Sequence, residues 1–217
     1  MVPVGTSSAV PSTTVSTGRR PLRWRVVDIV VASVLAVAVG VVFKLWEFGY
    51  EPLAAGTALL LPGTQALFGG VWLLAGPLVA IIVRKPGAAL FAELVAASVE
   101  ALFGTQWGWS TLEAGLVQGL GAEIVLALFL YRVWRLPVVL LAGAAAGLAM
   151  GLNDIVISYP GLDPAFKLVY VVCGVVSGAV IAGLGSWLLA RALARTGVLS
   201  SFAAGREHAR RRPTSAA

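Results

Sequence analysis

The sequence predicts an all-α membrane protein with six transmembrane helices. Of its 217 residues, 59% are hydrophobic and only 12% are charged, and the mean hydropathy is +0.90. Soluble domains carry about 25% charged residues. The apolar residues also come in blocks of about 20, the length that a helix needs to cross about 30 Å of hydrocarbon. The placement of the basic residues, described below, gives the bundle a direction across the membrane.

The two ends of the chain differ in composition from the blocks between them. Residues 1–22 are rich in Ser, Thr and Pro, which predicts a disordered tail. Arg19, Arg20, Arg23 and Arg25 stand directly before the first apolar run, which has no small-residue cleavage site. This arrangement favours a retained first span over a signal peptide. Residues 196–217 form a second, basic tail.

The transmembrane domain covers residues 23–195 in this prediction. Pro86 and Pro137 open two of its spans, at a position where a helix tolerates proline. Segment 47–63 starts polar and is too short to cross, so we expect a partly inserted or capping loop there. The six predicted spans are 27–46, 64–83, 86–104, 112–132, 137–157 and 167–190.

The basic residues fall almost entirely on one side of these spans. With both termini in the cytoplasm, 14 of the 16 Lys and Arg residues flank the cytoplasmic ends, and only Lys44 and Lys167 lie outside. This is the distribution that the positive-inside rule predicts. The net charge of +6 then reflects topology and predicts contact with anionic lipid headgroups, while nucleic-acid binding is a poor explanation.

Several function classes lack the residues that they need. Cys173 is the only cysteine and His208, in the basic tail, is the only histidine. The chain therefore predicts no disulfide, no metal site, no cofactor and no histidine-dependent catalysis. Asp28 and Asp154 lie at opposite ends of their spans and cannot form an aspartyl dyad. An enzyme is thus disfavoured, and a channel would need a polar path through the whole bundle.

Two carboxylates, Glu93 and Glu123, lie near the middle of apolar spans, where a charge costs about 2.5 kcal/mol or more. Glu93 and Glu100 are seven residues apart and share one helical face, about 10 Å apart along the axis. Glu100 either lines a cavity or extends to the outer interface. Gln118 and Glu123 point about 140° apart. We therefore expect one of them to line a cavity and the other to bond a neighbouring helix.

Other polar and aromatic residues also gather in the outer half of the predicted bundle. Asn153 lies in the outer third of its span, where it either closes a cavity or caps the interface. Trp46, Trp107 and Tyr170 fit either a cavity wall or an interfacial belt. Together these residues predict an outward-facing binding cup suited to a small organic cation.

The first span carries small residues at intervals of four: Ala32, Ala36 and Gly40. Such a stripe allows another helix to approach closely. The partner is either a second protein or another helix of the same chain. Spans five and six carry similar stripes, at 143–151 and 174–178.

These features together resemble the substrate-binding (S) components of energy-coupling-factor (ECF) transporters. The segments RKPGAALFAEL (84–94), FGTQWG (103–108) and LVQGLGAEIV (116–125) are similar to the YkoE family, S components for thiamine or its hydroxymethylpyrimidine precursor. The resemblance covers roughly residues 23–195, and the tails fall outside it.

The resemblance implies a non-enzymatic subunit for vitamin uptake in the bacterial cytoplasmic membrane. Substrate would bind outside, and a transmembrane coupling subunit with two ATPase subunits would power its release inside. The motifs transfer substrate binding to Glu93, Trp107, Gln118 and Glu123, and the family's alanine stripe implies that residues 32–40 dock onto the coupling subunit. An S component for a different vitamin and a stand-alone small-molecule carrier are the alternatives.

Overall fold

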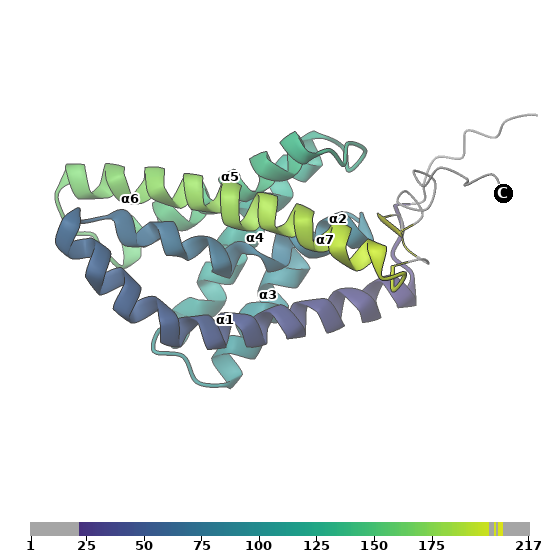
Figure 1. The fold of residues 1–217 in the computed structure, drawn as a ribbon, viewed down its shortest axis with the longest axis horizontal. Coiled ribbons are helices and arrows are strands. Elements are labelled where there is room, and N and C mark those ends of the chain that lie inside the picture. Colours follow the sequence, from purple (N-terminus) through teal and green to yellow (C-terminus); the bar gives the residue numbers. More distant parts are fainter. Residues whose placement is uncertain (1–21, 200–201, 203, 206–217) are drawn as a thin grey trace, which may run out of the picture.

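The computed structural model describes residues 22–199, 202 and 204–205, and every regular element in that part of the chain is a helix (Figure 1). Of the predicted tails, only Leu22 of 1–22 and residues 196–199, 202 and 204–205 of 196–217 are among the described residues. The elements are α1 (Val26–Leu60), η1 (Thr64–Leu73), α2 (Ala75–Val83), α3 (Ala88–Leu102), α4 (Ser110–Leu128), α5 (Leu136–Ile157), α6 (Pro164–Ser177), η2 (Gly178–Leu184) and α7 (Gly185–Arg195).

Five helical segments of the described chain are long and apolar enough to cross a membrane: Val26–Thr57, Thr64–Val83, Ser110–Leu128, Leu136–Ile157 and Pro164–Arg195. They coincide with five of the six expected spans. The remaining one, expected over 86–104, forms α3, which has 15 residues. At 1.5 Å per residue α3 is about 22 Å long, shorter than the bilayer core.

The structure corrects the interpretation of segment 47–63 as a loop. Helix α1 continues through it to Leu60, giving 35 residues and a length of about 52 Å. It bends in its second half (Figure 1), where Pro52 removes one backbone hydrogen bond of the helix. The extension persists because Ala and Leu favour helix and because its end is tied to η1, where the Thr64 hydroxyl donates to Thr57 O at 3.2 Å.

The second span is built from two kinds of helix. Residues Thr64–Leu73 form a 3₁₀-helix, and α2 follows after Leu74. A 3₁₀ run of this length is uncommon, and such stretches within a span often mark a functional hinge or a sequence under strain. It is held by Ser177 of α6, whose Oγ donates to Leu67 O at 2.5 Å and accepts from Gly70 N at 2.9 Å.

The last span passes from α6 through the π-helical turn η2 into α7. Glycines let this span lie directly against α5, where Gly143 faces Gly178 and Gly147 faces Gly174. The helices are so close that a Cβ on Gly143 or Gly147 would overlap a backbone carbonyl oxygen of the other helix. The stripes of spans five and six therefore serve internal packing.

The stripe of the first span also packs within the bundle in this structure, and its docking onto a coupling subunit stays a prediction. Ala32 and Ala36 are fully buried, in the same core cluster as Ala92 and Ala96 of α3. A Cβ on Gly40 would lie 2.6 Å from Ala96 O. These small residues are needed because α1 and α3 pack backbone to backbone, so in this conformation they present no surface to a partner.

The bundle has two chemically different ends. The arginine end, where α1 begins and α7 ends, holds Arg23, Arg25, Arg84, Arg132, Arg135, Arg191 and Arg195. There the buried Asp28 pairs with Arg25 at 2.8 Å, and Lys85 Nζ lies 3.6 Å from it. The cavity end, where α3 and α5 end and α4 and α6 begin, contains the site described next.

Candidate functional site

A cavity of about 160 Å³ lies between α1, η1, α3, α4, α5 and α6. The lining residues of α4 come from its first half, and those of α5 from its last third. A cavity of similar size made by mutation in another protein holds one benzene ring. The lining of the cavity in the present chain combines aromatic rings, carboxyl groups and amides, as expected for a pocket that binds an organic molecule with several polar groups.

Two carboxylates of α3 line the cavity, as their seven-residue spacing predicts. Glu93 and Glu100 are 1% and 2% exposed. Glu93 Oε1 accepts a hydrogen bond of 2.7 Å from Gly76 N of α2, and Glu100 Oε1 accepts one of 2.8 Å from Trp72 Nε1. Within the described chain, the other Glu93 oxygen, Oε2, is buried and has no hydrogen-bond partner. Burying such an oxygen is unfavourable unless something else bonds it.

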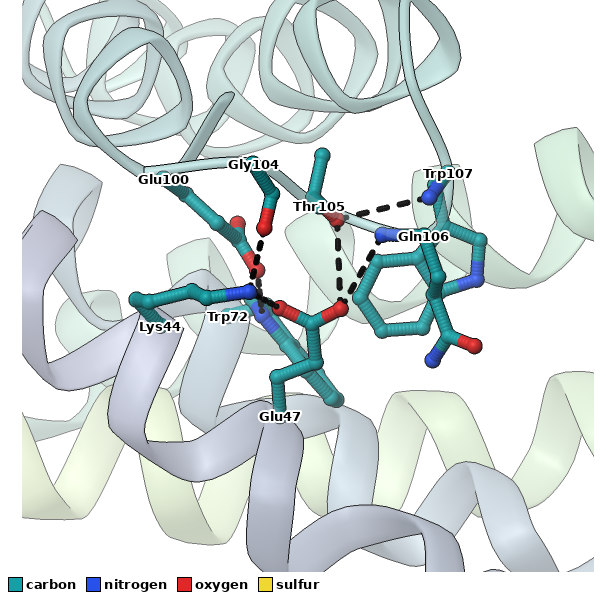
Figure 2. Close-up of polar contacts among 8 residues, drawn as sticks. All are labelled: Lys44, Glu47, Trp72, Glu100, Gly104, Thr105, Gln106 and Trp107. Carbon is teal, nitrogen blue, oxygen red and sulfur yellow. Dashed lines mark hydrogen bonds and ion pairs between the residues drawn. The ribbon is translucent and has the colours of Figure 1, made fainter. Parts of the chain in front are cut away.

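Three aromatic rings form one wall, which we call the aromatic box: Tyr50 of α1, Trp72 of η1 and Trp107 of the α3–α4 loop. The ring centroids of Trp72 lie 4.9 Å from Tyr50 and 5.3 Å from Trp107, and those of Tyr50 and Trp107 are 6.4 Å apart. All three contacts are edge-to-face. The Trp72 indole is oriented by its bond to Glu100 (Figure 2). Such rings can stack on a flat ligand or face a cation.

Helix α4 contributes a polar face. Thr111, Gly115 and Gln118 are spaced by four and three residues, so they lie on one side of the helix and line the cavity. Gly115 brings α4 against α3, because a Cβ there would lie 2.7 Å from the Ala97 Cβ. The Thr111 hydroxyl is the other buried side-chain atom, among the described residues, that lacks a hydrogen-bond partner. Both atoms without partners belong to residues that line this one cavity.

Another part of the wall comes from the last turns of α5 and from Tyr170 of α6. Asn153 Nδ2 donates to Glu113 Oε2 at 3.1 Å, and the Tyr170 hydroxyl donates to Asp154 Oδ2 at 2.8 Å. These bonds join α4 to α5 and α5 to α6. Asn153 therefore lies in the cavity wall, the first of the two positions expected for it.

Glu123 does not reach the cavity, contrary to its assignment to substrate binding. Its carboxylate accepts three backbone hydrogen bonds at the start of α3, from Gly87 N at 2.6 Å, Ala89 N at 2.9 Å and Leu90 N at 3.3 Å. These amides have no acceptor within their own helix, and the positive end of the helix dipole favours a carboxylate there. Glu123 therefore fixes α3 to α4, which is the second of the two roles that the sequence left open.

Trp46 is also outside the cavity. Its indole Nε1 donates to Phe68 O at 3.1 Å, so it ties α1 to η1. Of the eight residues predicted to bind substrate, the structure thus brings six to the cavity wall: Glu93, Glu100, Trp107, Gln118, Asn153 and Tyr170.

Two of the residues that sequence reasoning missed are informative. Thr111 could have been found, because it lies seven residues before Gln118 on the same face of a helix. Trp72 could not have been found. It lies on the same side as Gly69 because η1 has three residues per turn, and nothing in an apolar run distinguishes a 3₁₀-helix from an α-helix.

Comparisons with known proteins agree with this architecture. A family model described as "ABC-type cobalt transport system, permease component" matches residues 27–149. "Putative HMP/thiamine permease protein YkoE" of Bacillus subtilis (strain 168) is 36% identical over 190 residues, which cover 87% of this chain and 94% of that protein. The chain belongs to the YkoE family. A solved structure described as "Crystal structure of an S-component of ECF transporter" has 34% identity and a TM-score of 0.80, over 88% of this chain and 95% of that one.

Membership confirms the S-component fold and makes the chain a multi-pass protein of the bacterial cytoplasmic membrane. The three segments that resemble the YkoE family now have places in the structure. Residues 84–94 lead into α3 and include Glu93. Residues 103–108 include Trp107, and residues 116–125 include Gln118 and Glu123. Two of the segments meet where Glu123 binds the first amides of α3.

Proposed function

We propose that this chain binds thiamine or its hydroxymethylpyrimidine precursor in the cavity and delivers it for ATP-driven uptake. It acts as the substrate-binding subunit of an ECF transporter, together with a transmembrane coupling subunit and two ATPase subunits. The name of the Bacillus subtilis relative, which mentions both HMP and thiamine, supports this substrate class.

The observation that carries the proposal is the oxygen of Glu93 that has no partner, at a buried position of the cavity wall. A ligand that offers a hydrogen-bond donor or a positive charge would compensate its burial. Thiamine has both, since its thiazolium ring carries a fixed positive charge and its aminopyrimidine carries an amino group.

The aromatic box supports a ring-shaped organic ligand over a bare metal ion, although the description of the matching family model names cobalt. Tyr50, Trp72 and Trp107 offer faces and edges to a ring or an organic cation. The amide of Gln118 and the hydroxyl of Thr111 would bond the nitrogen atoms of a pyrimidine.

Orientation is part of the proposal. The arginine end faces the cytoplasm, where it contacts anionic headgroups, and the cavity end faces outside. The predicted binding residues that line the cavity then meet a substrate arriving from outside the cell.

The test is a titration of the purified protein in detergent with thiamine, followed through the fluorescence of its seven tryptophans. Because Trp72 and Trp107 line the cavity, we expect saturable quenching. Hydroxymethylpyrimidine titrated in parallel separates the two substrates. Saturation by an unrelated vitamin, with no response to thiamine or hydroxymethylpyrimidine, would contradict the proposal.

A further inference from the structure

The loop between α3 and α4, residues 103–109, is one of two parts of the cavity wall outside the helices, the other being the α5–α6 connection. It carries Trp107, which is 39% exposed while it also lines the cavity. The ring therefore separates the ligand space from the surroundings. The loop contains two glycines in the left-handed region, Gly104 at φ +78° and Gly108 at φ +57°, and a Cβ on either would meet no atom within 4 Å. The backbone thus has open space at Gly104 and at Gly108, which directly follows Trp107.

This loop is attached to α1 by a compact polar cluster (Figure 2). Lys44 Nζ and Glu47 Oε2 form an ion pair of 2.7 Å. Glu47 Oε1 accepts from Gln106 N at 3.1 Å and from the Thr105 hydroxyl at 3.5 Å. Lys44 Nζ also donates to Gly104 O. Three consecutive loop residues are therefore held by two side chains of α1.

The two side chains are themselves well shielded. The side chains of Lys44 and Glu47 are 18% and 9% exposed. They lie near the point where Gly40 packs against Ala96 and Val99 of α3, so the helix that carries them is firmly placed. Neither residue lines the cavity. Both lie close enough to Glu100 of the cavity wall to act on its charge, and both bond the loop directly.

The rest of the aromatic box has attachments other than the loop. Trp72 donates to Glu100, and Tyr50 belongs to α1. If the loop detached from α1, Trp107 would move while the other two rings would retain these attachments. The cavity would then open on the side of Trp107.

We propose that residues 103–109 form a lid over the cavity and that Lys44 and Glu47 are the positioning residues that hold it closed. This deepens the proposed function, because it identifies what controls the entry and release of substrate. Opening breaks the bonds to Gly104, Thr105 and Gln106 and swings Trp107 away from Trp72.

The test measures access to the cavity and needs no ligand. In a Cys173→Ser background, a cysteine is placed at Ala114, which lines the cavity, and its rate of reaction with a cationic methanethiosulfonate reagent is measured. We expect Glu47→Gln and Lys44→Met to raise this rate about tenfold, the factor that corresponds to 1.4 kcal/mol of opening free energy, and Glu47→Ala to raise it further.

Matched controls exist on the same side of the molecule. Glu51→Gln removes the same charge one turn further along α1, at an exposed position, and Lys167→Gln removes a cation that donates to Pro160 O. Both should leave the rate unchanged. Joining cysteines at positions 47 and 106 with a short reversible crosslinker should slow the reaction below that of the uncrosslinked protein.

Unchanged rates in both charge-removal variants, with unfolding temperatures near that of the parent protein, would overturn the lid. So would a crosslink that leaves the rate unchanged. Thiamine is added in a separate arm, where it should protect the cysteine at position 114. Loss of that protection alone, with the variants still reacting faster, would contradict the proposed substrate and leave the lid standing.

Discussion

Glu93 and Glu123 look alike in the sequence, yet the structure places them in opposite circumstances. Both are carboxylates buried in apolar helices, 1% and 8% exposed. Glu123 accepts three amide hydrogen bonds at the start of α3. Glu93 accepts one, from Gly76, and keeps a second oxygen without a partner beside the cavity. The difference indicates that a buried charge is structural where the protein compensates it fully and functional where it does not.

The largest expected effect belongs to the fully compensated glutamate. Glu123→Ala leaves the first amides of α3 without their acceptor, and we expect it to lower the free energy of unfolding by about 3 kcal/mol. Chemical or thermal unfolding in detergent measures this. The fraction that remains folded should bind thiamine with unchanged affinity. A normal unfolding midpoint combined with lost binding would reverse the assigned roles.

Glu93→Gln should weaken thiamine binding without lowering the free energy of unfolding. The new amide oxygen can still accept from Gly76 N, and the variant buries no carboxylate, so stability should be equal or higher. Affinity for thiamine should fall about 50-fold, close to the 2–3 kcal/mol expected for a charge-assisted hydrogen bond. Calorimetric titration gives the affinity, and Glu123→Gln serves as the matched variant. Equal losses of affinity in the two variants would remove the distinction.

Thr111→Val extends the comparison to the second atom without a partner. Because the hydroxyl bonds nothing in the described chain, its loss should not destabilise the protein. If it bonds the ligand, thiamine affinity should fall about fivefold, corresponding to about 1 kcal/mol. The same titration detects this. A less stable variant with full affinity would show that the hydroxyl serves the fold.

Trp46→Phe is expected to have the smallest effect. It removes the hydrogen bond to Phe68 O while it keeps an aromatic ring between α1 and η1. We expect a loss of about 1 kcal/mol in the free energy of unfolding and no change in thiamine affinity. Measured beside Trp107→Phe, it separates a tryptophan that packs helices from one that lines the cavity. Weaker binding by Trp46→Phe would place Trp46 in the site after all.

The sequence predicted the bundle well because an apolar block of about 20 residues has the length that a helix needs to cross the membrane. It misjudged segment 47–63, since a helix that continues past a proline is indistinguishable there from a polar loop. The two possible roles of the stripe at Ala32 and Ala36 could not be separated either, because a small-residue face looks the same whether its partner is internal or external.

The candidate site was predictable to the extent that helical periodicity places side chains. The shared face of Glu93 and Glu100 followed from their spacing. Periodicity could not predict which polar side chain would find a hydrogen-bond partner in another helix. Glu123 meets the start of α3, and Trp72 meets Glu100, only through tertiary packing and an irregular 3₁₀-helix.

A structure of the protein with thiamine bound tests the contrast between the two glutamates most directly. We predict a ligand nitrogen within about 3.2 Å of Glu93 Oε2, with Glu123 still accepting from Gly87, Ala89 and Leu90. A bound thiamine that leaves Glu93 Oε2 without a partner, or that draws Glu123 away from α3, would contradict the account.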